Sequence, residues 1–235
     1  MAQLMTTPTA GMAGADSGRI GKSTRRLLTA GLVAGPLYLL VGSVEALTRS
    51  GFDPTRDDWS LLSNGELGWI HIALFVTTGL LTIAGAIGMR RALAGGRAST
   101  WGPLLVGLYG LGLIGAGIFI ADPARGFPPG TPADAHAITW HGLMHLVSAG
   151  VGFIGLIAAC VVFARRFAGI GQTGWAAYSV ATDVLFLAAF VGVATGSQAG
   201  GPVLVLVTLA FTAAVVLGWA WISALAVKLM VDSRS

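Results

Sequence analysis

The sequence predicts an all-α fold, a polytopic membrane bundle of six transmembrane helices with two longer extracytoplasmic loops. Of 235 residues, 54% are apolar and only 10% are charged, and the mean hydropathy is +0.78. Soluble domains carry about 25% charged residues, so a cytosolic globular enzyme, a disordered chain and a nucleic-acid binder are excluded despite a pI near 9.8. Glycine is abundant, with 35 residues, as close-packed transmembrane helices require. The single Cys160 excludes an internal disulfide.

Six segments reach the roughly 20 mostly apolar residues that a membrane span needs. They cover residues 27–48, 67–89, 101–121, 140–163, 174–195 and 203–226. The last two come from one stretch without charge, which the Gly- and Pro-containing run 196–202 divides. We assign residues 21–228 to one six-helix transmembrane domain, preceded by a disordered cytosolic leader (1–20) and followed by a cytosolic tail (229–235).

The positive charges predict the topology. With both termini in the cytoplasm, eleven of the 14 Lys and Arg residues lie inside and three lie outside, as the positive-inside rule requires. We therefore expect a multi-pass protein of the cell membrane with cytoplasmic N- and C-termini. A cleaved signal peptide over residues 1–48 is the competing interpretation, but the apolar run is too long and no small-x-small cleavage site follows it.

A layer of acidic and imidazole side chains lies at the predicted extracytoplasmic ends of the spans. Its members near the helix ends are Glu45, His71, Asp122, His136, His141 and His145. A protein that only sits in lipid does not need such a layer, because polar groups in and near the membrane usually serve function. We interpret it as the candidate site, with His145, Asp122 and Glu45 as candidate catalytic residues.

Two of these histidines suggest a metal. His141 and His145 are four residues apart, so both rings project from one helix face. With His71, Asp122 or Glu45 as a further ligand, they would suit zinc or another divalent transition metal. A haem held between His71 and His145 is a second option. Alternatively, these are interfacial histidines hydrogen-bonded to a loop or to lipid headgroups.

The two long loops share an Asp-Pro-x-Arg motif, at residues 53–56 and 122–125, and each leads to a helix that begins with Trp and His. This pattern suggests a parallel internal repeat, a feature common in membrane proteins. The alternative is a structural one, in which the Asp and Arg side chains pair within a loop or across the two loops and cap the bundle.

Asp183 lies about ten residues into the fifth span, close to the expected bilayer midplane. A charged carboxylate there costs at least about 2.5–3.5 kcal/mol, so intramembrane acids are functional by default. The structural alternative is a neutral acid hydrogen-bonded to Ser179, Thr182 or a tyrosine.

The loop motifs also carry a family resemblance. They are the run from Gly51-Phe52-Asp53-Pro54 through Ser60-Leu61-Leu62 to Gly65-Glu66-Leu67-Gly68-Trp69, the segment 119–122, and Thr139-Trp140-His141-Gly142-Leu143-Met144-His145. With these motifs the chain resembles the DUF998 family of six-span membrane proteins of unknown function. The resemblance implies the fold and topology, and it points to Asp122, Gly142 and His145, followed by Ser60 and Trp69. It implies no activity.

Three classes of function fit this sequence. The first is a membrane enzyme that uses His145 and Asp122, with His141, Glu45 and a metal that activates water, on a lipidic or amphipathic substrate. An acid-only form of it is an isoprenoid cyclase that uses Glu45 and Asp183. The second is a non-catalytic membrane subunit or partner-binding protein. The third is a proton-coupled transporter that uses Asp183.

The expected partners are the lipid bilayer, a lipidic small molecule and a second copy of the chain, with no nucleic acid. The Gly31-x-x-x-Gly35 and Gly192-x-x-x-Gly196 spacings permit close helix contact. We expect these faces to be available for a homo-oligomer.

Overall fold

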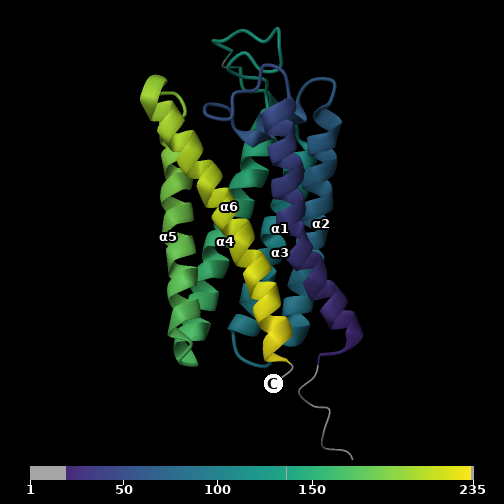
Figure 1. The fold of residues 1–235 in the computed structure, drawn as a ribbon. Helices are drawn as coiled ribbons and strands as arrows, with labels where there is room; N and C mark the ends of the chain where they lie inside the picture. The colour runs from purple at the N-terminus through teal and green to yellow at the C-terminus, as the bar shows by residue number, and fades with distance from the viewer. Residues whose placement is uncertain (1–19, 136, 234–235) are drawn as a thin grey trace, which may run out of the picture.

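The computed structural model describes residues 20–135 and 137–233, and this part of the chain is helical (Figure 1). The predicted leader, apart from its last residue, lies outside the described residues. The described helices are α1 (Lys22–Thr48), the short 3₁₀ helix η1 (Trp59–Ser63), α2 (Gly68–Ala92), α3 (Ala98–Ile118), α4 (Trp140–Gly169), α5 (Thr173–Gly196) and α6 (Gly201–Asp232).

All six α-helices are long and apolar enough to cross a membrane, which confirms the predicted six-helix bundle. Their boundaries differ from the predicted spans mainly at helix ends. Helix α6 continues to Asp232, past the predicted span end at 226. Helix α3 ends at Ile118 rather than at 121, because the carbonyls of Ala116 and Phe119 face the imidazole of His145.

The helices form a ring in chain order, in which each helix packs on the next and α6 packs on α1. Helix α1 begins and α6 ends at the same end of the bundle (Figure 1). We call this the termini end. The opposite end carries the two long connections, residues 49–67 and 119–139, and is called the loop end.

Glycines allow neighbouring helices of the ring to pack closely. A Cβ atom on Gly85 of α2 would lie 2.6 Å from the Gly31 Cα of α1, and one on Gly112 of α3 would lie 2.6 Å from the Gly152 Cα of α4. Gly35 likewise faces the Trp219 carbonyl of α6. Both predicted oligomer motifs therefore pack within the chain, since Gly196 of α5 also lies against a valine of α6.

Large aromatic side chains pack between the helices of the ring. Trp219, Trp221, Phe163 and Phe186 are all fully buried. Helix α6 crosses the bundle obliquely, close to α1 at the termini end and away from it at the loop end (Figure 1).

Candidate functional site

A cavity of about 880 Å³ occupies the loop half of the ring, and all six membrane helices contribute to its wall. This volume is within the range of about 300–1,000 Å³ that is usual for ligand pockets. The wall is mostly apolar and aromatic, with contributions from Tyr38, Phe75, Tyr109, Phe153, Phe190 and Phe211. Such a surface suits a molecule with an apolar body.

The mouth of the cavity is polar. The two loops and the start of α4 supply its polar lining, which includes Arg56, Asp58, Ser60, Asp122, Arg125 and His145. The cavity thus changes from apolar within the bundle to charged at the loop end. This gradient matches the two parts of an amphipathic molecule.

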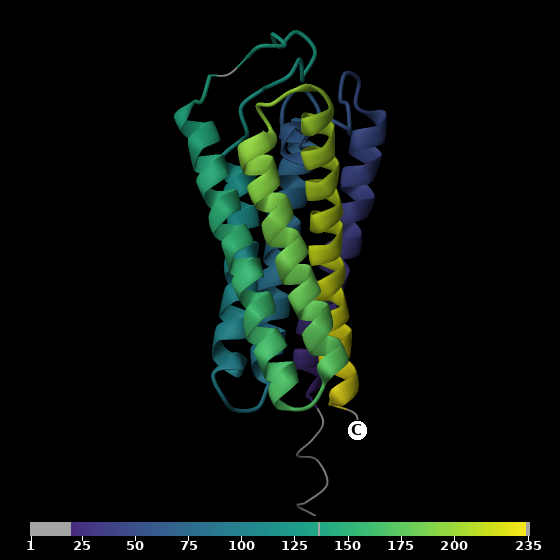
Figure 2. The ribbon, with the colours of Figure 1, turned by 90° about the vertical axis from the view of Figure 1, so that its left-hand side faces the viewer.

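Residues of α4 and α5 form one side of the cavity. Leu146 of α4 lines the cavity although 59% of its surface is exposed. A Cβ atom on Gly150 of α4 would meet only the Phe190 Cζ of α5, at 4.0 Å. The two helices diverge toward the loop end (Figure 2). The loop-end halves of α4 and α5 therefore lack the close glycine contacts that join α3 to α4.

His145 is the buried histidine of the cavity wall. Its Nδ1 lies 3.0 Å from the Ala116 carbonyl and 2.8 Å from the Phe119 carbonyl. Because carbonyl oxygens only accept hydrogen bonds, Nδ1 carries the proton and donates it. Nε2 is then the nitrogen with a lone pair, and it is the ring atom left to meet a ligand. An orienting bond on the far nitrogen is typical of a histidine that acts as an acid or base.

Asp122 holds the start of α4 in place. Its carboxylate accepts hydrogen bonds from the Thr139 backbone N–H at 2.8 Å and from the Thr139 hydroxyl at 2.6 Å. The Thr139 hydroxyl in turn accepts the Gly142 N–H and caps the helix. A side chain at Gly142 would collide with the Asp122 carboxylate. These contacts give a structural reason for an aspartate at position 122 and a glycine at position 142.

Arg125 joins the two loops across the mouth. Its Nε lies 3.3 Å from Asp57 Oδ1, and its Nη2 lies 2.9 Å from Asp58 Oδ2. The residue has a φ of 51°, which is uncommon for a side chain other than glycine. Burial raises the pKa of the Asp57 carboxyl, against hydrogen bonds from Asp53 and Arg125 that lower it.

The two Asp-Pro-x-Arg motifs have different geometry. Asp53 accepts hydrogen bonds from the N–H and hydroxyl of Thr55 within its own loop, whereas Asp122 reaches Thr139 beyond its loop. These hydrogen bonds from Thr55 hold the pKa of Asp53 below its usual value.

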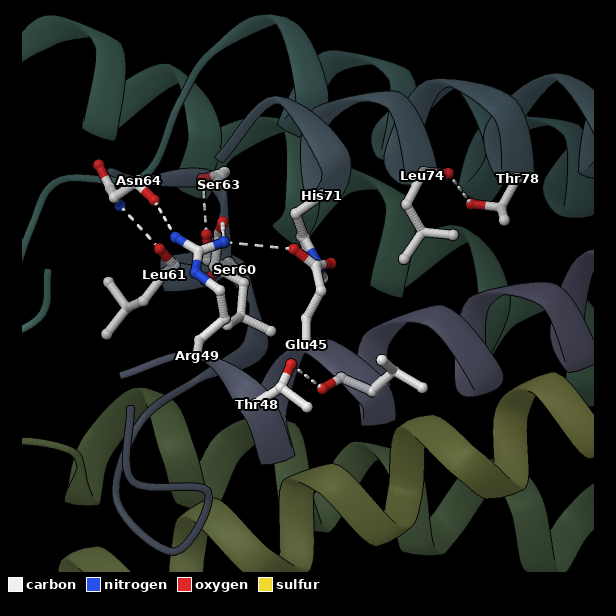
Figure 3. A network of polar contacts seen from close by, with 12 residues as sticks. Glu45, Thr48, Arg49, Ser60, Leu61, Ser63, Asn64, His71, Leu74 and Thr78 are labelled. Atoms are coloured by element: carbon white, nitrogen blue, oxygen red, sulfur yellow. Dashed lines mark hydrogen bonds and ion pairs between the residues drawn. The ribbon is translucent and has the colours of Figure 1, made fainter. Parts of the chain in front are cut away.

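Glu45 and His71 form a buried pair behind the cavity wall (Figure 3). His71 Nδ1 lies 2.8 Å from Glu45 Oε2, and Arg49 Nη1 lies 3.3 Å from Glu45 Oε1. Arg49 also donates to the carbonyls of Leu62 and Asn64, at 3.2 and 2.6 Å. The guanidinium therefore ties the end of α1 to the loop that carries η1, and neither Glu45 nor His71 lines the cavity.

The four predicted metal ligands are not brought together. Over residues 20–135 and 137–233, no three His, Cys, Asp or Glu side chains are placed to hold a metal ion. His141 is exposed and its ring lies against Trp140, whereas His145 is buried and His71 is engaged by Glu45. His136 lies outside the described residues.

The residues do not fit a haem between His71 and His145 either. The ring of Phe75 contacts both imidazoles, with centroids 4.6 Å from His71 and 6.2 Å from His145. Only His145 lines the cavity, whereas the Nε2 atom of His71 is buried behind the wall, so the cavity does not reach both imidazoles.

Asp183 lies on α5 outside the cavity wall. Its Oδ1 is buried and has no hydrogen-bond partner among the described residues. The predicted partners are engaged elsewhere, because Ser179 donates to the Trp175 carbonyl and Thr182 to the Tyr178 carbonyl.

Sequence reasoning missed the aromatic wall and the role of Arg49. The spacing of Glu45 and Arg49, one helical turn apart, is a signal of pairing that was available. Tyr38 and Tyr109 gave no such signal, because their shared position depends on how α1 and α3 pack.

Comparisons with known proteins agree with this fold. A family model described as a protein of unknown function (DUF998) matches residues 32–228, from within α1 to within α6. Curated proteins give no match to the chain, and solved structures give none either.

Proposed function

The chain belongs to the DUF998 family, whose function is unknown, and from that premise we propose that it binds an amphipathic, lipid-like molecule in the cavity. The observation that carries this proposal is the cavity itself, which is aromatic within the bundle and charged at its mouth. The apolar body of the ligand lies among Phe153, Phe190 and Phe211, and its polar group lies near His145 and Arg125.

The ligand comes from the bilayer. Leu146 of α4 and Ala194 of α5 line the cavity and are exposed on the side of the bundle that faces lipid, so an apolar chain reaches the cavity between α4 and α5 without crossing water. We expect the loop end to face the outside of the cell membrane, because the Lys and Arg residues gather at the other end.

Photolabelling tests this proposal. The protein is reconstituted in vesicles with a phospholipid that carries a diazirine in its acyl chain, and the labelled peptides are identified by mass spectrometry. The variant Thr212→Phe places a ring in the cavity, since Thr212 lines it. The matched control is Thr77→Phe, on an exposed face of α2.

We expect adducts on cavity residues of α4, α5 and α6 in the wild type and in Thr77→Phe, with a loss of about tenfold in Thr212→Phe. Adducts confined to the outer surface of the bundle, or equal in all three proteins, would contradict binding in the cavity.

A second candidate function is acid–base chemistry on the polar group of the bound molecule. The orientation of His145 favours it, because the protonated Nδ1 leaves Nε2 as the base. Reconstituted wild type and His145→Asn are incubated with mixed phospholipid vesicles, and the lipids are compared by mass spectrometry. A new lipid species that forms only with the wild type supports catalysis, and identical lipids in both samples argue for binding alone.

The other functions considered have less support. A cyclase that uses Glu45 and Asp183 requires two acids at one substrate, and neither acid lines the cavity. A transporter that uses Asp183 requires a polar path to that residue, and the cavity wall does not include it. A partner-binding subunit has no specific surface in its favour.

A further inference from the structure

The deep part of the cavity contains hydrogen-bond donors without acceptors. Tyr38 of α1 and Tyr109 of α3 both line the cavity and are 6% and 2% exposed. Neither hydroxyl makes a hydrogen bond within residues 20–135 and 137–233. Each hydroxyl is therefore available to a ligand.

Trp219 of α6 brings the two tyrosines together. Its ring centroid lies 5.2 Å from that of Tyr38 and 5.3 Å from that of Tyr109. Its indole N–H is buried and has no partner in the described part of the chain. An indole N–H can only donate, so one buried N–H and two phenol hydroxyls lie here without a partner among the described residues.

The donors lie well inside the bundle. Tyr38 is ten residues from the end of α1, and Tyr109 is nine residues from the end of α3. At 1.5 Å per residue, both are about 14 Å below the loop end of their helices. Unpaired donors at such a depth cost free energy, because lipid supplies no acceptor.

We propose that the deep end of the cavity binds a carbonyl oxygen carried on a flat ring, as in a lipid-soluble quinone. This inference rests on the proposed function and specifies its ligand. The hydroxyls of Tyr38 and Tyr109 donate to the oxygen, and the ring of Phe75, which lines the cavity in contact with Tyr38, gives the aromatic surroundings that a flat ring prefers.

Two probes of similar shape separate this proposal from general apolar binding. A decyl-substituted benzoquinone carries the carbonyl oxygens, and decylbenzene lacks them. Their dissociation constants are measured by titration calorimetry on the detergent-purified full chain. The variants are Tyr38→Phe and Tyr109→Phe, and the matched control is Tyr178→Phe, since Tyr178 is the remaining tyrosine and lies outside the cavity wall.

We expect Tyr38→Phe and Tyr109→Phe each to weaken quinone binding by about two- to tenfold, the value of one hydrogen bond. Decylbenzene binding changes by less than about twofold in every variant, and Tyr178→Phe changes neither probe. Equal losses for both probes, or no loss for either, would overturn the carbonyl site while leaving the cavity proposal intact. If the wild type binds neither probe, and Thr212→Phe does not change photolabelling, both proposals fail.

Discussion

Glu45 Oε2 lies 2.8 Å from His71 Nδ1, in a place where both side chains are almost completely buried. The other oxygen of the same carboxylate faces Arg49. The Glu45 carboxylate thus contacts two side chains behind the cavity wall, Arg49 at the end of α1 and His71 on α2. This arrangement fixes α1, α2 and the first loop in one position and thereby shapes the mouth of the cavity.

Removal of this acid should destabilise the protein. Glu45→Ala leaves His71 and Arg49 buried without their partner, and breaking a buried pair in this way costs about 3–5 kcal/mol. Thermal unfolding of the detergent-purified protein measures the effect. Glu66→Ala, at an exposed acid in the same loop, is the control, and equal melting temperatures for the two variants would refute a structural role of the pair.

Substitution should separate the structural role of His145 from its chemical role. In His145→Leu the carbonyls of Ala116 and Phe119 lose their donor, so we expect a destabilisation of about 1–3 kcal/mol. In His145→Asn the side-chain amide can still donate to these carbonyls, and the melting temperature should stay near that of the wild type. Similar melting temperatures for the Leu and Asn variants would mean that the two hydrogen bonds contribute little.

Two glycines of α4 and α3 should respond differently to alanine. Gly112→Ala places a methyl group against the Gly152 backbone, and such overpacking costs about 1–3 kcal/mol. Gly150→Ala faces open space toward Phe190, so the better helix propensity of alanine should stabilise α4 by up to about 1 kcal/mol. A strong loss of stability in Gly150→Ala would show that α4 and α5 are in close contact there.

Arg125 should couple the two loops. Arg125→Ala removes hydrogen bonds to the carboxylates of Asp57 and Asp58, each worth about 1.5–3 kcal/mol when a charged group is involved. Hydrogen exchange of the backbone amides of Arg56 and Asp57, which both donate to the Asp53 carbonyl, should become faster. The control Arg56→Ala removes an exposed side chain of the same loop, and identical exchange in the two variants would argue against coupling.

The turn at Asp53 should depend on pH. Hydrogen bonds from Thr55 lower the pKa of Asp53 below 3.8, so the ionised acid favours the folded loop. Its stabilising effect is complete above pH 3.8 and is lost as the pH falls through the lowered pKa. Protection of the Thr55 amide against hydrogen exchange should therefore be constant at neutral pH and decrease below 3.8. In Asp53→Ala this acid-dependent decrease should be absent, and its persistence would assign the effect to another group.

The fold was largely predictable from local sequence. Long apolar segments and the charge-free stretch divided near Gly200 predict six helices, because membrane spans depend mainly on length and hydropathy. Helix α3 ends three residues before the predicted span does, and the sequence alone does not show that the carbonyls of Ala116 and Phe119 accept from His145 at that point.

The candidate site was predictable only in part. Asp122 and His145 were identified as polar groups in an apolar chain, and both line the cavity. The pairing of Glu45 with His71 and the isolation of His141 depend on how the helices rotate in the ring. The cavity itself depends on how all six helices pack around it, which no residue spacing shows.

Native mass spectrometry of protein released directly from vesicles tests the central claim, that the ring encloses one amphipathic molecule. We predict a wild-type peak with one retained lipid-like molecule, which is kept in Thr77→Phe and lost in Thr212→Phe. A wild-type chain without any retained molecule, or equal retention in all three proteins, would contradict the claim.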